Sequence, residues 1–276
     1  MLHILRHFSV ERAGETGERA EHRMREFLKA EWRYLVMLNY AVSPDLLLPH
    51  VPNGVELDTW NGRNYVSMVG FLFLRTKVLG FVFPFHVNFE EVNLRFYVRK
   101  RTADGWRRGV VFIKEIVPRQ IIATVARAFY NEPYAAMPMR HSIDKENGRL
   151  RHGGAVEYGW LHQGCWNSLR AITAGDAYLP AEGSEEEFIT EHYWGYTAQR
   201  NGNCTEYRVE HPRWNVWRVE KAALQCAVAS LYGEKFVAPL GSKPQSAFVA
   251  EGSPIAVSKA AAIVPSMRQF ISRNPA

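Results

Sequence analysis

The chain has 276 residues, of which 47% are hydrophobic and 22% are charged, a balance typical of a globular protein rather than a disordered or fibrous one. It contains no run of about 18 apolar residues that would span a membrane, its start lacks the features of a secretory signal, and its three cysteines lie far apart, so we expect a cytoplasmic protein. The net charge of +6 raises the question of an acidic partner, although the basic residues are dispersed.

The first part of the chain predicts a helix followed by long strands. Residues 20–29 space Met24, Phe27 and Leu28 along one side of a helix. Aromatic and β-branched runs bounded by turn residues then predict strands. These runs cover residues 31–42, 55–60, 65–78, 88–100 and 107–119. The last two flank an Ala-Asp-Gly turn, which predicts a hairpin.

A helix is predicted directly after this hairpin. Residues 120–132 carry apolar side chains at helical spacing, between Pro118 and Pro133. Beyond residue 137, short β-rich runs separated by Gly, Asn or Pro continue the sheet. Ser184 and Glu187 have the spacing of a capping box at the start of a short helix, and Gly233 ends another helical turn. The tail beyond residue 258 predicts a terminal helix.

No internal repeat or linker divides the chain. We therefore expect a single domain over residues 1–276, mainly antiparallel β with two or three helices packed on it. Residues 1–24 and 259–276 are expected to be peripheral segments of that domain. The fold class is α+β with a predominance of strands.

The sequence contains none of the short motifs that bind common cofactors or metals. There is no GxGxxG, no GxxxxGK[ST], no GxSxG, no HExxH and no CxxC. We expect neither a cofactor nor a metal site.

Polar side chains share one face of the strand over residues 88–100. Glu91, Asn93 and Arg95 lie at i, i+2 and i+4 and therefore project together. An acid, an amide and a guanidinium in line could hold a small carboxylate or carbonyl group, with Arg95 as a bidentate anchor. The alternative is the solvated face of a half-exposed strand.

Three further features have both a functional and a structural interpretation. Lys114 lies in an apolar strand, where burial would make its amine nucleophilic, but it could also extend from a strand end to solvent. His192 follows Glu191, and the two could act as base and acid or serve only in packing. The basic hairpin at residues 99–108 is either a solvated tip or a phosphate-binding patch.

Several long stretches resemble the YqjF-like family of uncharacterised bacterial proteins. They include "EWRYLVMLNYAV", "FEEVNLRFYVR", "ARAFYNEPY" and "EEEFITEHYWGYT", and the resemblance extends over about residues 25–257. That family is grouped with the acetoacetate decarboxylase superfamily. The resemblance implies a conical antiparallel β-barrel with flanking sheet and helices, an active site inside the barrel, and a homo-oligomer.

The catalytic pattern of the superfamily is only partly present. In the decarboxylases an Arg followed by Glu, and then a Pro, precede two adjacent lysines, the first of which forms a Schiff base. The resemblance places Arg127 and Pro133 on this pattern, but Ala128 on the Glu and Tyr134 and Ala135 on the lysines. A phenol cannot form an imine, so Schiff-base chemistry at this position is excluded. Glu91 matches an acidic residue that lines the decarboxylase cavity.

These observations predict a protein that binds a small molecule. We expect an anionic or carbonyl-containing ligand in an internal cavity, contacted by Glu91, Asn93, Arg95, Arg127 and Tyr134. Whether the ligand is turned over stays open. One alternative is a lyase, hydratase or isomerase in which Glu91 and Tyr134 act as acid and base, with Lys114 as a displaced amine. Another alternative is nucleic-acid binding through residues 99–108.

Overall fold

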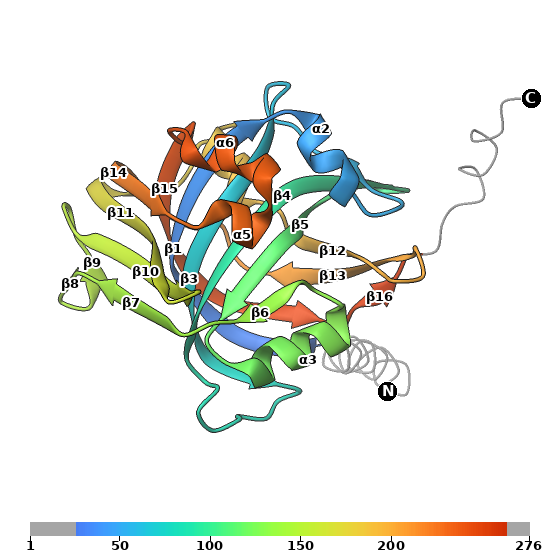
Figure 1. Ribbon diagram of the computed structural model, residues 1–276, viewed down its shortest axis with the longest axis horizontal. Coiled ribbons are helices and arrows are strands. Elements are labelled where there is room, and N and C mark those ends of the chain that lie inside the picture. The colour runs from blue at the N-terminus through green and yellow to red at the C-terminus, as the bar shows by residue number, and fades with distance from the viewer. Residues whose placement is uncertain (1–25, 264–276) are drawn as a thin grey trace, which may run out of the picture.

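The computed structural model describes residues 26–263, which form one large sheet, a separate two-stranded sheet and short helices around them (Figure 1). The strands are β1 (Glu26–Val42), β2 (Glu56–Leu57), β3 (Asn64–Val78), β4 (Phe89–Thr102), β5 (Gly105–Val117), β6 (Tyr134–Ala136), β7 (Met139–Ile143), β8 (Lys145–Glu146), β9 (Arg149–Leu150), β10 (Ala155–His162), β11 (Cys165–Tyr178), β12 (Trp194–Ala198), β13 (Cys204–Glu210), β14 (Val216–Gln225), β15 (Ser246–Ser258) and β16 (Ala261–Ala262). The helices are α2 (Pro44–Leu47), η1 (Leu48–His50), α3 (Gln120–Tyr130), α4 (Glu185–Thr190), α5 (Val228–Tyr232), η2 (Glu234–Phe236) and α6 (Val237–Gly241). The prediction of a mainly antiparallel β protein is confirmed.

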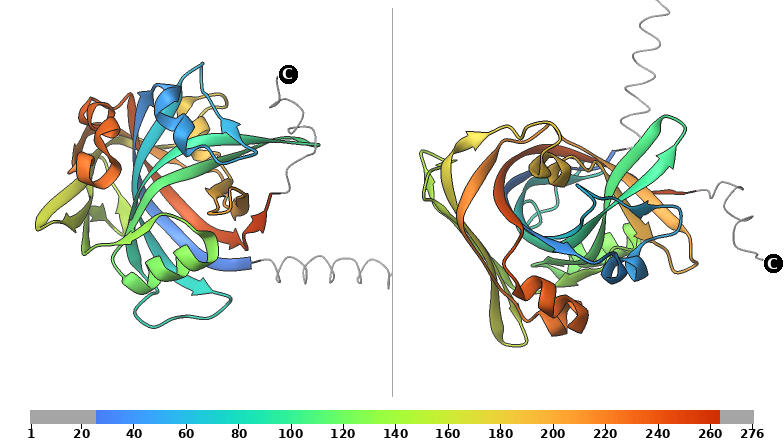
Figure 2. Two further views of the ribbon diagram at one scale, coloured as in Figure 1. Left: turned by 45° about the vertical axis from the view of Figure 1, so that its right-hand side comes forward. Right: turned by 90° about the horizontal axis from the view of Figure 1, so that it is seen from above.

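Part of the sheet closes on itself. Strands β13, β12, β5, β4, β3, β1 and β15 are hydrogen-bonded in this order, and the pairing of Val209 with Val257 joins β13 back to β15. Neighbours in this ring are antiparallel, except for β12 and β5, which are parallel. Figure 2 shows the ring from above.

Alternation along the strands separates an inner core from an outer one. On β4, Val92, Leu94, Phe96 and Val98 are buried on the outer side of the ring, as the predicted two-residue period requires. Glu91 and Asn93 are equally buried, but on the inner side. The strand is therefore buried on both faces, so the alternative of a solvated polar face is wrong.

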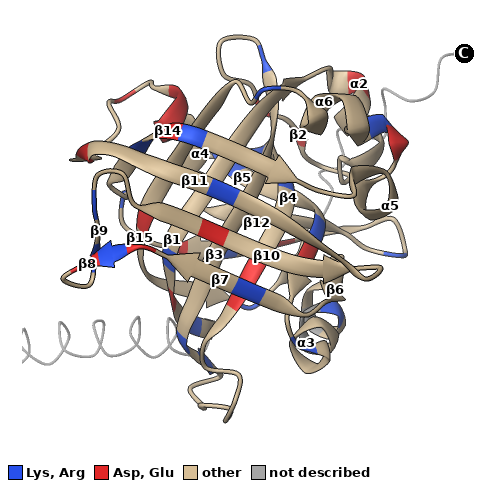
Figure 3. Cartoon of the chain, turned by 60° about the vertical axis from the view of Figure 1, so that its left-hand side comes forward, with Lys and Arg blue, Asp and Glu red and all other residues tan. Residues whose placement is uncertain are grey.

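The outer core lies under a second layer of sheet. Beyond β15 the sheet continues through β14, β11, β10 and β7, which curl back over the outer face of β1, β3 and β4. The two layers approach closely at Gly70 on β3, where an added Cβ would lie 2.8 Å from the ring of Tyr158 on β10. Figure 3 shows this outer layer, on which basic and acidic residues are interspersed.

Helix α3 and strand β6 follow the β4–β5 hairpin. The helix ends at Tyr130, earlier than predicted, because Asn131 adopts a left-handed conformation with φ 57° and donates its N–H to the carbonyl of Arg127. After Pro133 the chain forms β6, which pairs with β5 in parallel and sets Tyr134 opposite Glu115. Residues 134–136 are therefore a short strand of the sheet.

The predictions for the helix ends and for the two chain ends have mixed outcomes. Ser184 caps α4 as predicted, because its Oγ accepts the N–H of Glu187 at 3.2 Å, and Gly233 ends α5. The predicted helix over 20–29 is wrong for residues 26–29, where Phe27 packs against Tyr130 and the chain is strand; residues 20–25 lie outside the described part. The predicted terminal helix is wrong at residues 261–262, which form β16, and residues 264–276 lie outside the described part.

Candidate functional site

A pocket of about 530 Å³ lies inside the ring of strands. The apolar part of its lining includes Trp32, Leu35, Phe71, Phe73, Phe112 and Trp214. Leu79, Phe83 and Ile121 also line the pocket but are 50–57% exposed, so they form its rim. They belong to the β3–β4 loop and to α3, which lie at the same end of the molecule in Figure 1. A pocket of this size and lining suits a small, partly apolar molecule.

Four of the predicted site residues meet in this pocket. Glu91, Asn93 and Arg95 point into it from β4, and Tyr134 points into it from β6. Asn93 Nδ2 donates to Glu91 Oε1 at 2.9 Å, and the Tyr134 hydroxyl donates to Glu91 Oε2 at 3.0 Å. Both carboxylate oxygens of Glu91 thus have a fixed donor.

Two further carboxyls, Glu115 and Glu132, line the same pocket. Glu115 stands opposite Asn93 on β4 and opposite Tyr134 on β6, so the register places it beside Glu91. Glu132, just before β6, accepts hydrogen bonds from Thr197 at 2.7 Å and from Tyr207 at 2.9 Å. Both side chains are at most 4% exposed. The pocket therefore holds a cluster of three buried carboxyls.

The ring of Tyr207 reaches this cluster because its neighbour on β12 is a glycine. Gly195 pairs with Tyr207, and a Cβ at Gly195 would lie 2.1 Å from Cζ of the tyrosine. No other residue type leaves this space. The glycine thus determines where the donor to Glu132 lies.

Burial raises the pKa values of all three carboxyls. The pKa of Glu91 rises from 4.5 to about 7, because burial outweighs the hydrogen bonds from Asn93 and Tyr134 and the charge of Arg95. Burial likewise raises the pKa of Glu132 to about 7 against its two donors. The pKa of Glu115 is raised well above its usual range by burial and by the neighbouring Glu132 and Glu91. Near neutral pH the cluster can therefore both donate and accept protons.

Arg95 is the only Lys or Arg among the described residues that line the pocket, and it is 9% exposed. Its Nε has no hydrogen-bond partner, and no ion pair to its guanidinium is formed within the described part of the chain. The guanidinium carbon lies 5.8 Å from the centre of the Tyr97 ring. A buried guanidinium nitrogen without an acceptor is costly, because it has lost water without gaining a partner.

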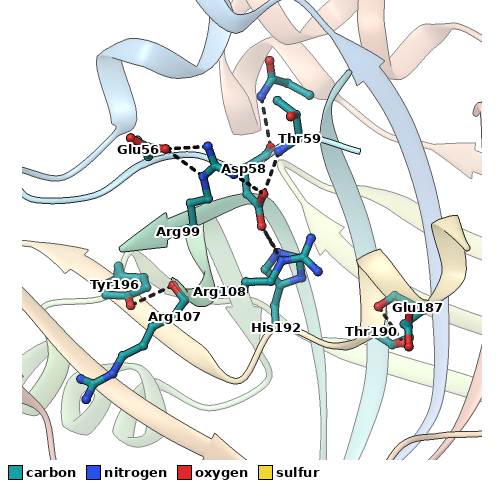
Figure 4. A network of polar contacts seen from close by, with 11 residues as sticks. Glu56, Asp58, Thr59, Arg99, Arg107, Arg108, Glu187, Thr190, His192 and Tyr196 are labelled. Atoms are coloured by element: carbon teal, nitrogen blue, oxygen red, sulfur yellow. Dashed lines mark hydrogen bonds and ion pairs between the residues drawn. The ribbon is translucent and has the colours of Figure 1, made fainter. Parts of the chain in front are cut away.

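A second polar network borders the pocket through His192 (Figure 4). Asp58 accepts hydrogen bonds from Arg108 at 2.7 Å and from the Thr59 N–H at 2.9 Å, and His192 Nε2 lies 3.2 Å from its carboxylate. Although burial opposes it, hydrogen bonding by His192 and Arg108 holds the pKa of Asp58 at about 2. Burial lowers the pKa of His192 to about 4, so the imidazole is neutral at pH 7. The carboxylate partner of His192 is Asp58 rather than the adjacent Glu191.

Two predicted site residues lie elsewhere. Arg127 is exposed on α3, where its Nε donates to the carbonyl of Ala123 at 3.1 Å. Lys114 donates to the carbonyl of Leu231 on the outer side of β5, and burial lowers its pKa. Neither is among the residues that line the pocket.

A β-bulge explains why Lys114 and Glu115 exchange faces. Arg95 pairs with Phe112 and Leu94 pairs with Lys114, so Ile113 is an extra residue on β5. Without it, the alternation that points Phe112 into the pocket would point Lys114 there too. The bulge instead turns Glu115 inward, so the sequence pattern did not predict that this residue lines the pocket. Each of the two acids that were not predicted had a signal in the sequence. Glu115 is a charged residue in an apolar strand, and Glu132 comes directly before the Pro that follows α3.

The basic hairpin at residues 99–108 carries paired charges. Arg99 lies 2.7 Å from Glu56, and Lys100 and Arg107 lie 3.0 and 3.1 Å from Glu206. These ion pairs leave less free positive charge for a phosphate backbone than the sequence suggests. Within residues 26–263, no group of three or more His, Cys, Asp or Glu side chains could hold a metal ion, and no helix is long and apolar enough to cross a membrane.

A family model described as an uncharacterized conserved protein, DUF2071, matches residues 29–254. The chain belongs to this family. The uncharacterized protein YqjF of Bacillus subtilis (strain 168) is 27% identical over 208 residues, which cover 73% of this chain and 78% of that protein. The resemblance to YqjF-like proteins is thus confirmed.

The fold of the chain is similar to that of solved structures of acetoacetate decarboxylase. The acetoacetate decarboxylase of Legionella pneumophila aligns with a TM-score of 0.59 at 12% identity, over 87% of this chain and 88% of that one. The enduracididine biosynthesis enzyme MppR, complexed with pyruvate, aligns with a TM-score of 0.61 at 12% identity, over 86% and 90%. The acetoacetate decarboxylase-like fold of the DUF2071 chain is therefore confirmed. At these identities the likeness concerns the fold alone.

Proposed function

We propose that this DUF2071 protein binds a small carboxylate- or carbonyl-containing molecule in the pocket inside the ring, with Arg95 as the anchor for its negative charge. The observation that carries the proposal is a guanidinium that is 9% exposed and has no acceptor for its Nε within the described residues. A carboxylate would bind it in the bidentate geometry that makes such pairs strong.

The neighbouring polar groups suit a ligand of this kind. Tyr134 is a donor at any ordinary pH, since burial and the carboxyls around it raise the pKa of its phenol well above the usual range. When Glu91 is protonated, it can donate to the Tyr134 oxygen, which frees the Tyr134 proton for the ligand. Tyr134 could then bind a carbonyl oxygen while Arg95 binds the carboxylate. Pyruvate, which occupies the structurally similar MppR, has both groups.

Binding without a covalent bond is the expected mode. An imine requires a primary amine, and the described residues that line the pocket include no lysine. Tyr134, which the family resemblance aligned with the Schiff-base lysine, instead makes a hydrogen bond to Glu91.

A lyase, hydratase or isomerase is the second candidate function. The observation that favours it is the pKa of Glu91, about 7, combined with its 3.0 Å hydrogen bond from Tyr134. A carboxyl that titrates near neutral pH is suited to general acid and base catalysis. NMR in D₂O would detect such an activity as deuterium exchange next to the carbonyl of a 2-keto acid, and Glu91→Gln should abolish it. Exchange that survives this substitution would contradict the role of Glu91.

Isothermal titration calorimetry with a panel of aryl and alkyl carboxylates and 2-keto acids tests the binding proposal. Loss of a charge-assisted bidentate contact should weaken binding about tenfold to a hundredfold in Arg95→Gln. Arg127→Gln is the matched control, because it removes an exposed arginine that lies outside the pocket. Equal affinity in Arg95→Gln and the unmodified protein would refute Arg95 as the anchor.

A further inference from the structure

The polar end of the pocket holds more acid than base. Glu91, Glu115 and Glu132 line it with Arg95 as the only Lys or Arg within the described lining. A ligand carboxylate that binds Arg95 would use the one positive charge available to this cluster. The three buried carboxyls would then have no cationic partner, which favours a ligand that supplies one.

The geometry of the cluster also leaves an acceptor unused. Glu115 is 2% exposed, and its Oε2 has no hydrogen-bond partner within the described residues. The register holds this carboxyl between Asn93 and Tyr134, next to the Glu91 side chain that both of them contact. Two complementary atoms in one pocket are therefore without a hydrogen-bond partner: Arg95 Nε has no acceptor, and Glu115 Oε2 has no donor within the described residues.

Building on the proposed function, we propose that the ligand is an amino acid with an apolar side chain. Its carboxylate binds Arg95, its ammonium group binds the carboxyl cluster of Glu91, Glu115 and Glu132, and its side chain packs against the aromatic walls.

An ammonium group fits the cluster better than other cations. It has three donors for several acceptors that lie close together. A metal ion fits less well, because the described residues include no group of three metal-ligating side chains in suitable positions. The apolar walls, which include Trp32, Phe71 and Trp214, then suit an aromatic or branched side chain.

The proposal predicts the direction of proton exchange on binding. The other titratable or charged groups in the lining are Arg95, Tyr130, Tyr134, Tyr207, His86, His192 and His211. Burial raises the pKa values of the three phenols and lowers those of His192 and His211 to about 4. Among the buried groups, the carboxyls of Glu91 and Glu132 are therefore the ones with a pKa of about 7. An ammonium group favours their ionised form, so binding releases protons and strengthens as pH rises. A plain carboxylate favours their protonated form, so its binding takes up protons and weakens.

Calorimetry with three matched probes tests this inference on the unmodified protein: phenylalanine (both enantiomers), 3-phenylpropanoate and 2-phenylethylamine. Titrations in buffers of different ionisation enthalpy, between about pH 6 and 8, give the number and sign of the protons exchanged. We expect one enantiomer of phenylalanine to bind at least about tenfold more tightly than 3-phenylpropanoate, with proton release.

The outcomes separate the inference from the proposed function. If 3-phenylpropanoate binds as tightly as phenylalanine, and Arg95→Gln weakens it, the amino-acid inference is refuted and the proposed function stands. If neither carboxylate probe binds, both are contradicted. Glu132→Gln should weaken phenylalanine about tenfold and leave 3-phenylpropanoate unweakened. Glu220→Gln, an exposed change on β14, is the matched control and should alter neither.

Discussion

The buried carboxyl of Glu91 should make the stability of the protein fall as pH rises. Its pKa in the folded protein is about 7, above the ordinary value of 4.5 that applies to the unfolded chain. The folded state therefore holds the proton more tightly, and this contribution is fully present below about pH 4.5 and lost as pH rises through 7. Since a tenfold change is worth about 1.4 kcal/mol, the free energy of unfolding should fall by about 3 kcal/mol over this interval because of Glu91 alone.

Glu91→Gln removes the titration while keeping the shape of the side chain. The new amide can still accept from Asn93 Nδ2 through its oxygen and can donate to the Tyr134 hydroxyl. Urea unfolding, followed by fluorescence of the eight tryptophans, gives the free energy of unfolding at a series of pH values between about 4.5 and 8. The stability of the variant should gain about 3 kcal/mol relative to the unmodified protein across this range. Parallel pH profiles for the two proteins would refute a raised pKa at Glu91.

Two further predictions concern the supports of the site. Gly195→Ala should destabilise the protein by about 1–3 kcal/mol in urea, because the added Cβ displaces Tyr207 from its hydrogen bond to Glu132. Gly241→Ala, with nothing within 4 Å of the added atom, should have little effect, and equal losses in the two variants would contradict this explanation. Asp58→Asn should cost about 2 kcal/mol at neutral pH, because it removes a carboxylate whose pKa falls from 3.8 to about 2 on folding through its contacts with His192 and Arg108. Because the pKa of Asp58 in the folded protein is about 2, the unmodified protein should lose this stability on acidification from about pH 4 toward 2. An acid-unfolding profile that is the same in the variant and the unmodified protein would contradict this explanation.

The sequence was most informative where local alternation decides the structure. The two-residue period over 88–100 predicted that Glu91, Asn93 and Arg95 share a face, because side chains in a regular strand must alternate. The capping box at Ser184 was equally readable, since its partners lie within one helical turn. The family resemblance added Tyr134 to the residues predicted to line the cavity, and the structure places its hydroxyl 3.0 Å from Glu91 Oε2.

What could not be predicted depends on contacts between distant segments. The bulge at Ile113, which exchanges the faces of Lys114 and Glu115, arises from the pairing of β5 with β4 and leaves no mark in the local pattern. The partnership of Asp58 with His192 joins residues that are 134 positions apart. Residues 20–29 have a helical spacing, but residues 26–29 are part of β1, where Phe27 packs against Tyr130 of α3. Tertiary contacts therefore outweigh the local pattern there.

A crystal structure of the protein with phenylpyruvate would test the central claim most directly, because this probe carries both a carboxylate and a carbonyl group. We predict the carboxylate within about 3 Å of the guanidinium nitrogens of Arg95, with the phenyl ring against the aromatic walls of the pocket. An empty pocket at a saturating concentration, or a bound probe whose carboxylate leaves Arg95 without an acceptor, would contradict it.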